Sequence, residues 1–202
     1  NDLIAKAATV NAGQALNVNA GNNVTITQGQ ASQSLDAASQ HTSSGFLSST
    51  TTTTRIRNAS TTAVGSSFEG RTVNMSAGQD LTVQGSNVLA DQNVNLAAGG
   101  NVNITAAQNT QSQSNFRQTT QSGLMSSGGM GFTVGSRMQS ADQQGQSTTA
   151  AASTVRSTSG NVTINAGKAY TQTGSDVLTP GLGNPFGSGN IAITAQKVDI
   201  TE

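Results

Sequence analysis

Short doublets of apolar residues, two positions apart, recur along the whole chain with one small or polar residue between them. In a β-strand, residues two apart point to the same face, so each doublet predicts a short strand with one apolar and one polar face. The Gly, Asn and Thr that fill the pattern are poor helix formers. The doublets are Leu16/Val18, Val24/Ile26, Val73/Met75, Leu81/Val83, Val94/Leu96, Val102/Ile104, Val162/Ile164, Ile191/Ile193 and Val198/Ile200.

The spacing of the doublets limits how the strands can be joined. Linkers of 2 to 5 residues are too short for the crossover that parallel neighbours need. An antiparallel meander would suit such linkers, but it would not require the same Gly–aliphatic–polar–aliphatic phrase in every strand. Three short strands that wind round a triangular section satisfy both constraints, and Val73 to Val94, 21 positions, would be one turn. The sequence therefore predicts an all-β fold, a right-handed parallel β-helix.

The chain also repeats itself on a larger scale, which is typical of stacked units that are each too small to bury an apolar face alone. The first matches are 78 positions apart and the later ones 89 apart, because 11 residues are inserted in the second copy. The matching segments are NVTIT (23–27) with NVNIT (101–105), SGFLSS (44–49) with SGLMSS (122–127), and GSNVL (85–89) with GSDVL (174–178).

Each repeat contains a long excursion that breaks the apolar pattern. We expect residues 1–202 to be a single β-helical fragment of a much larger protein. Repeat one covers about 1–80 with its excursion at 28–69, and repeat two covers about 81–202 with its excursion at 106–159. The excursions are rich in Ser, Thr and Gln, and phrases such as TTTTTRIRN favour strands. We expect each to be a long β-hairpin or flap; a disordered low-complexity loop is the alternative.

Composition narrows the class of protein. The chain is 33% hydrophobic but only 3% aromatic, which favours a thin, repeated core of Val, Ile, Leu and Ala. Nine basic and nine acidic residues give a formal net charge of +0, so a nucleic-acid partner is not expected. Without Cys there is no disulfide frame. No apolar run reaches the roughly 18 residues of a membrane span, so no stable span is expected.

Catalytic and metal sites are not expected either. Glycan-cleaving β-helical enzymes need carboxylates that converge on one face, whereas the nine acids here are scattered singly. His41 is the one histidine and has no partner arrangement that spacing would favour. We therefore predict that the segment is not an enzyme and binds no cofactor. The acids are Asp2, Asp36, Glu69, Asp80, Asp91, Asp142, Asp176, Asp199 and Glu202.

The excursions carry arginines and large apolar side chains, including Phe68, that a narrow core cannot hold. Exposed apolar residues rimmed by Arg mark interaction surfaces. One hypothesis is that these residues form a contact surface for a partner; the alternative is that they pack the flaps against the wall of the β-helix. The candidate residues are Phe46, Leu47, Arg55, Arg57, Phe116, Arg117, Leu124, Met125, Phe132 and Arg137.

The segments AGQDLTVQGSNVLADQNVNLAAGGNVNITAAQNTQSQS (77–114) and SGNVTINAGKAYTQTGSDVL (159–178) resemble a known family. They are similar to the haemagglutinin repeats of filamentous haemagglutinins and of the toxin-delivery proteins of contact-dependent growth inhibition. The resemblance covers essentially the whole chain. It implies a very large secreted protein of Gram-negative bacteria, exported by two-partner secretion through an outer-membrane pore and folded into a filament on the cell surface.

For function, the resemblance leaves two possibilities. The first is a structural and interaction segment of a filament that mediates cell–cell contact and delivers a C-terminal toxin into neighbouring bacteria. The second is an adhesin segment that binds a host-cell glycan or protein directly. The implied partners are the secretion pore during export, a receptor or envelope on the target cell, and neighbouring coils of the same filament.

Overall fold

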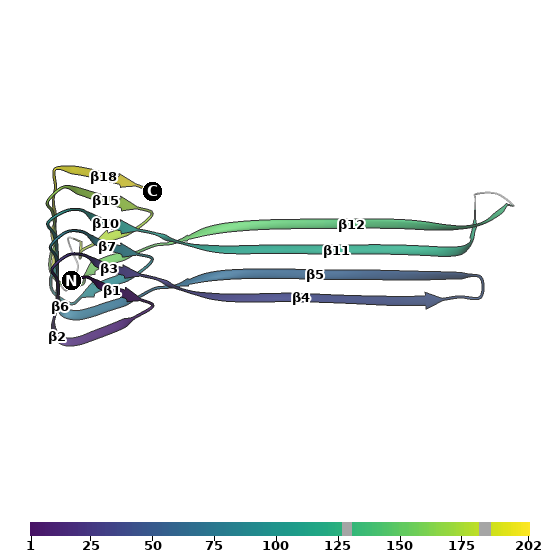
Figure 1. Ribbon diagram of the computed structural model, residues 1–202, viewed down its shortest axis with the longest axis horizontal. Helices are drawn as coiled ribbons and strands as arrows, with labels where there is room; N and C mark the ends of the chain where they lie inside the picture. Colours follow the sequence, from purple (N-terminus) through teal and green to yellow (C-terminus); the bar gives the residue numbers. More distant parts are fainter. Residues whose placement is uncertain (127–130, 182–186) are drawn as a thin grey trace. The chain divides into compact units, whose positions relative to one another are not determined.

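The computed structural model describes residues 1–126, 131–181 and 187–202, and these residues are organised in eighteen β-strands (Figure 1). They divide into two compact units. We call them the stacked body and the hairpin sheet. The stacked body comprises Asn1–Ala31, Thr62–Asn109 and Thr149–Glu202, and the hairpin sheet comprises Ser32–Thr61 and Thr110–Thr148.

The strands of the stacked body are short, apart from two that bend part-way along. They are β1 (Leu3–Lys6), β2 (Thr9–Ala20), β3 (Val24–Thr27), β6 (Ser67–Ala77), β7 (Leu81–Gln84), β8 (Asn87–Ala90), β9 (Val94–Ala98), β10 (Val102–Thr105), β13 (Thr154–Ser157), β14 (Val162–Ala166), β15 (Ala169–Thr173), β16 (Asp176–Leu178), β17 (Ile191–Thr194) and β18 (Lys197–Thr201). Both excursions contribute long strands, β4 (Gly29–Ser44), β5 (Ser48–Val64), β11 (Ala107–Ser126) and β12 (Phe132–Ala151).

Parallel pairing arranges the stacked body in three stacks. The first stack has the order β1-β3-β7-β10-β15-β18. The second contains the first halves of β2 and β6 followed by β8, β13 and β16, and the third contains their second halves followed by β9, β14 and β17. The chain visits the three stacks in the same order on each circuit. Val73 lies opposite Val94, so the predicted step of 21 residues is the length of one circuit. The prediction of an all-β fold with parallel strands is confirmed.

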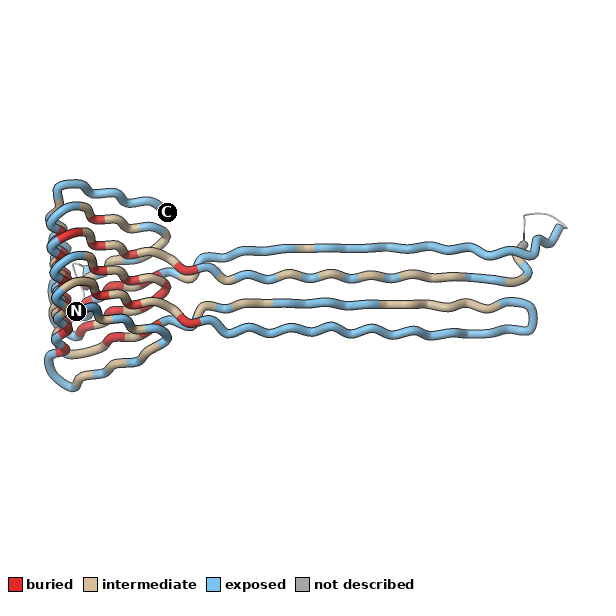
Figure 2. The backbone as a smooth tube through the Cα atoms, in the orientation of Figure 1, coloured by how far each residue is buried: buried red, intermediate tan, exposed pale blue. Residues whose placement is uncertain are grey.

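The predicted doublets form the core, shown in red in Figure 2. Val24, Val73 and Val94 have no exposed surface, and the other doublets from Leu16 to Ile164 are also buried. Exposure returns at β17 and β18, the last strands of the third and first stacks, where Ile191, Val198 and Ile200 are exposed. A side chain in a terminal strand has a neighbouring layer on one side only, so the same pattern leaves it partly in water.

Two aromatic residues complete this core, and neither was predicted to lie there. Phe68 was assigned to an excursion, but it belongs to β6 and is only 3% exposed. That prediction was wrong because the first excursion ends earlier than its loss of pattern suggests. Tyr170 is fully buried in β15, where its hydroxyl donates a 2.7 Å hydrogen bond to Oε1 of Gln172. The partnered hydroxyl explains how a narrow core accepts a tyrosine.

A column of serines marks the corner between the first and second stacks. Ser66, Ser86 and Ser153 are buried and each precedes a strand of the second stack. The backbone N–H of Ser66 donates to Oγ of Ser86 (3.1 Å), and the N–H of Ser86 donates to Oγ of Ser153 (3.2 Å). The N–H of Ser153 continues the column to Oγ of Ser175 (3.2 Å). The hydroxyls thus satisfy backbone donors that would otherwise be buried without a partner.

The same hydroxyls close the corner, whether or not an excursion interrupts it. On an uninterrupted circuit, Oγ of Ser86 donates to the carbonyl of Gln84, two residues back (2.8 Å), across Gly85 with φ +52°. On interrupted circuits, Oγ of Ser66 donates to the carbonyl of Thr27 and Oγ of Ser153 to that of Thr105, both at 2.7 Å. The two ends of each excursion are therefore joined by the same contact that forms an ordinary corner.

A second column lies where the strands of the first stack begin. The backbone N–H of Asn23 donates to Oδ1 of Asp2 (3.0 Å), that of Asp80 to Oδ1 of Asn23 (3.2 Å), and that of Asn101 to Oδ1 of Asp80 (2.7 Å). Asp and Asn alternate along it. Each side chain bonds the backbone of the next layer, so the column fixes the register of successive circuits.

Replacing Ser153 by Ala is expected to lower the free energy of unfolding by about 1–3 kcal/mol. The reason is that the change removes the acceptor of the Ser86 N–H and the donor to the Thr105 carbonyl in a buried place. Ser175→Ala is the matched control, because Ser175 is only half-buried and water can replace its hydroxyl. Chemical denaturation of both variants checks this. Equal losses would contradict the structural role of the buried column.

Burial raises the pKa of Tyr170 to about 12. Because this value lies above that of the unfolded chain, near 10, the contribution of Tyr170 to stability is complete below about pH 10 and is lost as the pH rises through 12. The chain has one Tyr and no Trp, so an ultraviolet phenolate titration reports this group alone. We expect a midpoint near 12, and Tyr170→Phe should remove the signal. A midpoint near 10 in the folded protein would show that the ring is solvated.

Candidate interaction surface on the hairpin sheet

The two excursions are not separate flaps, because their strands form one sheet with the order β12-β11-β5-β4 (Figure 1). β5 and β11 pair antiparallel over fourteen residue pairs, from Thr61 opposite Thr110 to Ser48 opposite Gly123. On the other side of β5, the hydroxyls of Ser39 and Thr54 are 2.7 Å apart and those of Thr42 and Thr51 are 3.1 Å apart. This pairing of excursions distant in the sequence was not predicted.

The hairpin sheet has no buried core in the part that the structure describes. Every residue of this unit whose burial is described is exposed or half-buried, as the pale and tan tubes in Figure 2 show. Ser, Thr and Gln occupy most positions on both faces. What holds such a sheet together is its backbone hydrogen bonding and its cross-strand side-chain pairs, each of which contributes roughly 0.2–1 kcal/mol. Both faces of the sheet are therefore accessible to solvent over its described residues.

A charged cluster lies on one face of this sheet. Arg55 on β5 binds Asp36 on β4 through two hydrogen bonds, from Nε to Oδ1 (3.0 Å) and from Nη2 to Oδ2 (2.7 Å). Arg57 adds a third, from Nε to Oδ2 (3.2 Å). The hydrogen bonds from Arg55 lower the pKa of Asp36 to about 2. Two guanidinium groups carry more N–H donors than one carboxylate accepts, so the cluster has a net positive charge and free donor capacity.

Shallow grooves cross the sheet beside this cluster. One, of about 680 Å³, is lined by Asp36 and Arg57 together with Ser and Gln side chains of β11 and β12. Another, of about 510 Å³, is lined by Arg55, Arg57, Phe116 and Asp142. Arginines beside one aromatic ring and many hydroxyl and amide groups are suited to a polar ligand rich in hydroxyl or carboxylate oxygens. Among the described residues that line these two grooves, the ionisable side chains are Asp36, Arg55, Arg57 and Asp142.

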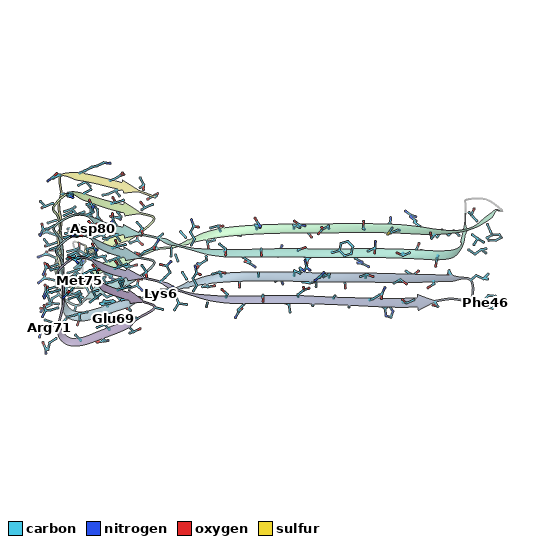
Figure 3. The ribbon with its side chains drawn as sticks, in the orientation of Figure 1. Lys6, Phe46, Glu69, Arg71, Met75 and Asp80 are labelled. Carbon is cyan, nitrogen blue, oxygen red and sulfur yellow. The ribbon has the colours of Figure 1, made fainter. Side chains whose placement is uncertain are left out.

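The ends of the hairpins carry a second group of candidate residues, which we call the tip patch: Phe46, Leu47, Leu124 and Phe132. Phe46 is 99% exposed and is labelled in Figure 3, and the other three are exposed as well. The N–H of Leu124 donates to the carbonyl of Leu47 (2.9 Å), so the ends of the two hairpins are joined. Gly123 has φ +123°, and a Cβ there would lie 2.2 Å from that carbonyl, so the link requires glycine.

The ten predicted residues do not form one continuous surface. Arg55, Arg57 and Phe116 belong to the charged cluster and its grooves, whereas four others make the tip patch. Arg117 follows Phe116 in an extended strand and therefore points to the opposite face. Arg137 is exposed on β12, and Met125 is half-buried near the end of β11. The four residues of the tip patch were therefore among the predicted residues, but their grouping at the ends of the hairpins was not predicted.

The alternative that Phe46 packs its flap against other parts of the chain is not supported. With 99% of its surface exposed, the ring packs against no other described side chain.

Sequence reasoning missed Asp36 as part of the site. Its signal was the Arg-x-Arg pair at 55 and 57, which needs a counter-ion on the neighbouring strand, but the partner depends on the register of the hairpin.

Other kinds of site are not seen in the described residues. Among them, no group of three or more His, Cys, Asp and Glu side chains could hold a metal ion. The described part of the chain also has no helix with the length and apolarity to cross a membrane. Asp80, one of the nine acids, accepts a hydrogen bond from the backbone N–H of Asn101 in the column where the first stack begins.

Comparisons with known proteins agree on a family. The family model described as "Hemagglutinin repeat" matches residues 45–197. The chain is 43% identical over 176 residues to "tRNA nuclease CdiA" of Escherichia coli (strain STEC_O31), covering 86% of this chain and 5% of that protein. It is 44% identical over 165 residues to "16S rRNA endonuclease CdiA" of Enterobacter cloacae subsp. cloacae, covering 81% and 5%.

A more distant relative is "tRNA nuclease CdiA-2" of Burkholderia pseudomallei (strain 1026b), 35% identical over 138 residues, which are 68% of this chain and 4% of that protein. The chain thus spans only about 5% of the length of the Escherichia coli and Enterobacter cloacae relatives. No solved structure is significantly similar to it.

The lowered pKa of Asp36 leads to a test of the charged cluster. The carboxylate stabilises the sheet above about pH 4, and this contribution is lost as the pH falls through about 2. In a carbon-13 NMR titration, Asp36 should titrate near 2 in the natural chain and move towards its ordinary value of 3.8 in Arg55→Gln. Arg117→Gln, on the opposite face, is the control and should leave the midpoint unchanged. An unchanged midpoint in Arg55→Gln would show that the ion pair does not form in solution.

Proposed function

The chain belongs to the hemagglutinin-repeat family, and we propose that it is a structural and interaction segment of a secreted bacterial surface filament. Its role in such a filament is to mediate contact between cells and to support delivery of a C-terminal toxin into neighbouring bacteria. The observation that carries this proposal is the 43–44% identity to CdiA proteins over more than four-fifths of the chain.

The architecture of the stacked body supports a filament. We infer that its three stacks are the walls of a right-handed parallel β-helix, in which each circuit adds one layer to every stack. Two features favour this interpretation: each circuit visits the stacks in the same order, and the columns of Ser and of Asp/Asn run from one circuit to the next. A structure of this kind grows by adding layers, so its length is set by the number of repeats.

Secretion to the surface of a Gram-negative bacterium, through an outer-membrane pore, follows from the same family relationship and is likewise proposed. A chain without Cys forms no disulfide while it crosses an oxidising compartment unfolded, which is compatible with this route.

Catalysis is not assigned to this segment. The relatives are named as nucleases, but the matched region is about one twentieth of their length. Two of its carboxylates make structural contacts: Asp80 accepts a hydrogen bond from the N–H of Asn101, and Asp36 is paired with Arg55. We propose that the nuclease activity of such a protein resides outside the segment described by residues 1–202. The role of this segment is to space and present the nuclease.

A direct adhesin role is the second candidate, favoured by the tip patch and by the grooves beside Arg55 and Arg57. Exposed aromatic side chains at the ends of long strands are placed to enter an apolar surface, and the arginines are suited to oxygen-rich ligands such as glycans. The relatives are named as nucleases, and a protein that carries a nuclease fits the delivery of a toxin better than adhesion alone.

The tip patch gives the test that separates these roles. In the full protein that contains this segment, we would replace Phe46, Leu47 and Phe132 by Ser. Each buried apolar side chain contributes roughly 1.5–3 kcal/mol to an interface, so attachment to target bacteria should fall at least about tenfold, together with growth inhibition of those bacteria.

The matched control is the replacement of three exposed apolar residues that lie away from the tips and from the grooves, Ile4, Ile56 and Val64, by Ser. It should leave attachment unchanged, and both variants should keep the thermal unfolding of the natural protein. Loss of host-cell binding with intact inhibition of bacteria would favour the adhesin role. If attachment and inhibition both persist in the tip variant, the tip patch is not the contact surface.

A further inference from the structure

The two hairpins pair in the register of the sequence repeat. Thr54 lies between Ser39 on one side and Arg117 on the other. Thr51 lies between Thr42 and Thr120 in the same way. In both cases the two flanking residues differ by 78 (117 − 39 and 120 − 42), which is the offset between the repeats. Repeat-equivalent residues therefore flank the same residue of β5, and the sheet advances by one hairpin per repeat.

The spacing of the hairpins within the sheet equals the spacing of their points of departure within the first stack. One hairpin contributes two strands to the sheet, so equivalent strands lie two strand spacings apart, about 9.6 Å. The excursions leave after β3 and β10, and these strands are separated in the first stack by β7 alone. Their departure points are thus also two strand spacings apart. Because both intervals are set by the same backbone hydrogen bonding, in-register pairing of successive hairpins requires no adjustment.

Interrupted and uninterrupted circuits alternate, and the alternation continues to the end of the first stack. The circuits of β3 and β10 lead into excursions, whereas β7 leads directly to β8, and β15 directly to β16. The N–H of Gly85 donates to the carbonyl of Thr105, after which an excursion leaves, and the N–H of Gly174 donates to the carbonyl of Thr201 in the same way, both at 3.0 Å. Thr201 therefore occupies the place from which a third excursion would leave.

The outer strands of the hairpin sheet are open along their length. β4 and β12 are edge strands of 16 and 20 residues, and their side chains are exposed at nearly every described position. A long open edge presents unpaired N–H and C=O groups that readily pair with another strand, and natural sheets usually protect it. The neighbouring strand β5 shows which partner such an edge accepts, because it pairs with the outgoing strand of the following repeat.

We propose that β12 is the docking edge for the outgoing strand of the excursion of the next hemagglutinin repeat, and that the hairpin sheet continues in this way across successive repeats. The occupant is a Ser/Thr/Gln-rich strand equivalent to β4 and β11, pairing antiparallel. This inference rests on the family assignment and on the register of the hairpins. It does not rest on the delivery role, so the docking of β12 and the delivery role can each fail without the other.

The register of the new pair follows from the existing one. A Cβ on Gly145 of β12 would lie 3.3 Å from the side chain of Gln113 of β11, so these residues are neighbours. In an antiparallel pair, four residues back from Gly145 on β12 corresponds to four residues forward from Gln113 on β11. This step places Ala141 beside Arg117. Since Arg117 is the repeat equivalent of Ser39, the equivalent of Ser39 in the next repeat should lie directly opposite Ala141.

Cysteine cross-linking tests this register, and the chain has no Cys that could interfere. We would join residues 1–201 to residues 28–202 of a second copy, so that Thr201 takes the place of Thr27 and the first excursion of the second copy becomes the third of the chain. Ala141→Cys in the first copy and Ser39→Cys in the second should form a disulfide at least tenfold faster than Ala141→Cys with Ser43→Cys. Ser43 is a matched control on the same face, roughly 14 Å along the strand.

A chain with Ser39→Cys and Thr54→Cys in one copy shows that the hairpins are folded. If this pair closes while the test and control pairs form disulfides at equal rates, the proposal is overturned. Amide hydrogen exchange in the full protein gives a second measurement that does not depend on the fusion. Residues 132–151 should exchange at least tenfold more slowly there than in the 202-residue chain. Equal exchange in both would overturn the proposal.

Discussion

Hydrogen bonding between strands about 4.8 Å apart is the constraint on which this structure depends. In the stacked body it places each circuit directly over the previous one, so every inward position becomes a column of equivalent side chains. Val24, Leu81 and Val102 share one column of the first stack, and all have no exposed surface. A core built in columns can be thin and still dry, because each side chain is covered above and below by the next layers as well as by the side chains of the other two stacks. This explains how a chain with few aromatic residues buries a continuous core.

Corners are where such a structure would leave backbone groups unsatisfied, and the serine column solves this at the first corner. A buried hydroxyl both donates and accepts, so one Ser per circuit bonds the preceding strand's carbonyl and the N–H of the neighbouring layer. The carbonyl that Ser153 binds belongs to Thr105, 48 residues away, yet the contact equals that of an uninterrupted corner. The body therefore keeps its corner contact at both excursions, and a longer excursion adds only the slowly growing entropic cost of loop closure.

The sequence predicts the strands of the body well, because a two-residue period with a buried face is a strong local signal. It fails where this signal is absent. The first half of β6 has Phe68 as its one large buried apolar residue, and β13 has Val155, so neither segment contains a recognisable doublet. β15 replaces the doublet with Tyr170 and Gln172, which are joined by a hydrogen bond. Asp36 and the pairing of the two excursions could not be read from the sequence, because both depend on a register between strands that are polar on both faces.

The lack of a core changes what stabilises the hairpin sheet. A two-stranded hairpin that is polar on both faces is at best marginally stable in water, because it has no apolar area to bury. Each hairpin here gains its stability from cross-strand pairs with its neighbours, such as the fourteen pairs between β5 and β11. In a linear array of this kind, an interior hairpin has two stabilising interfaces and a terminal one has a single interface. The order of the tip residues and of the cluster around Asp36 should therefore increase with the number of consecutive repeats.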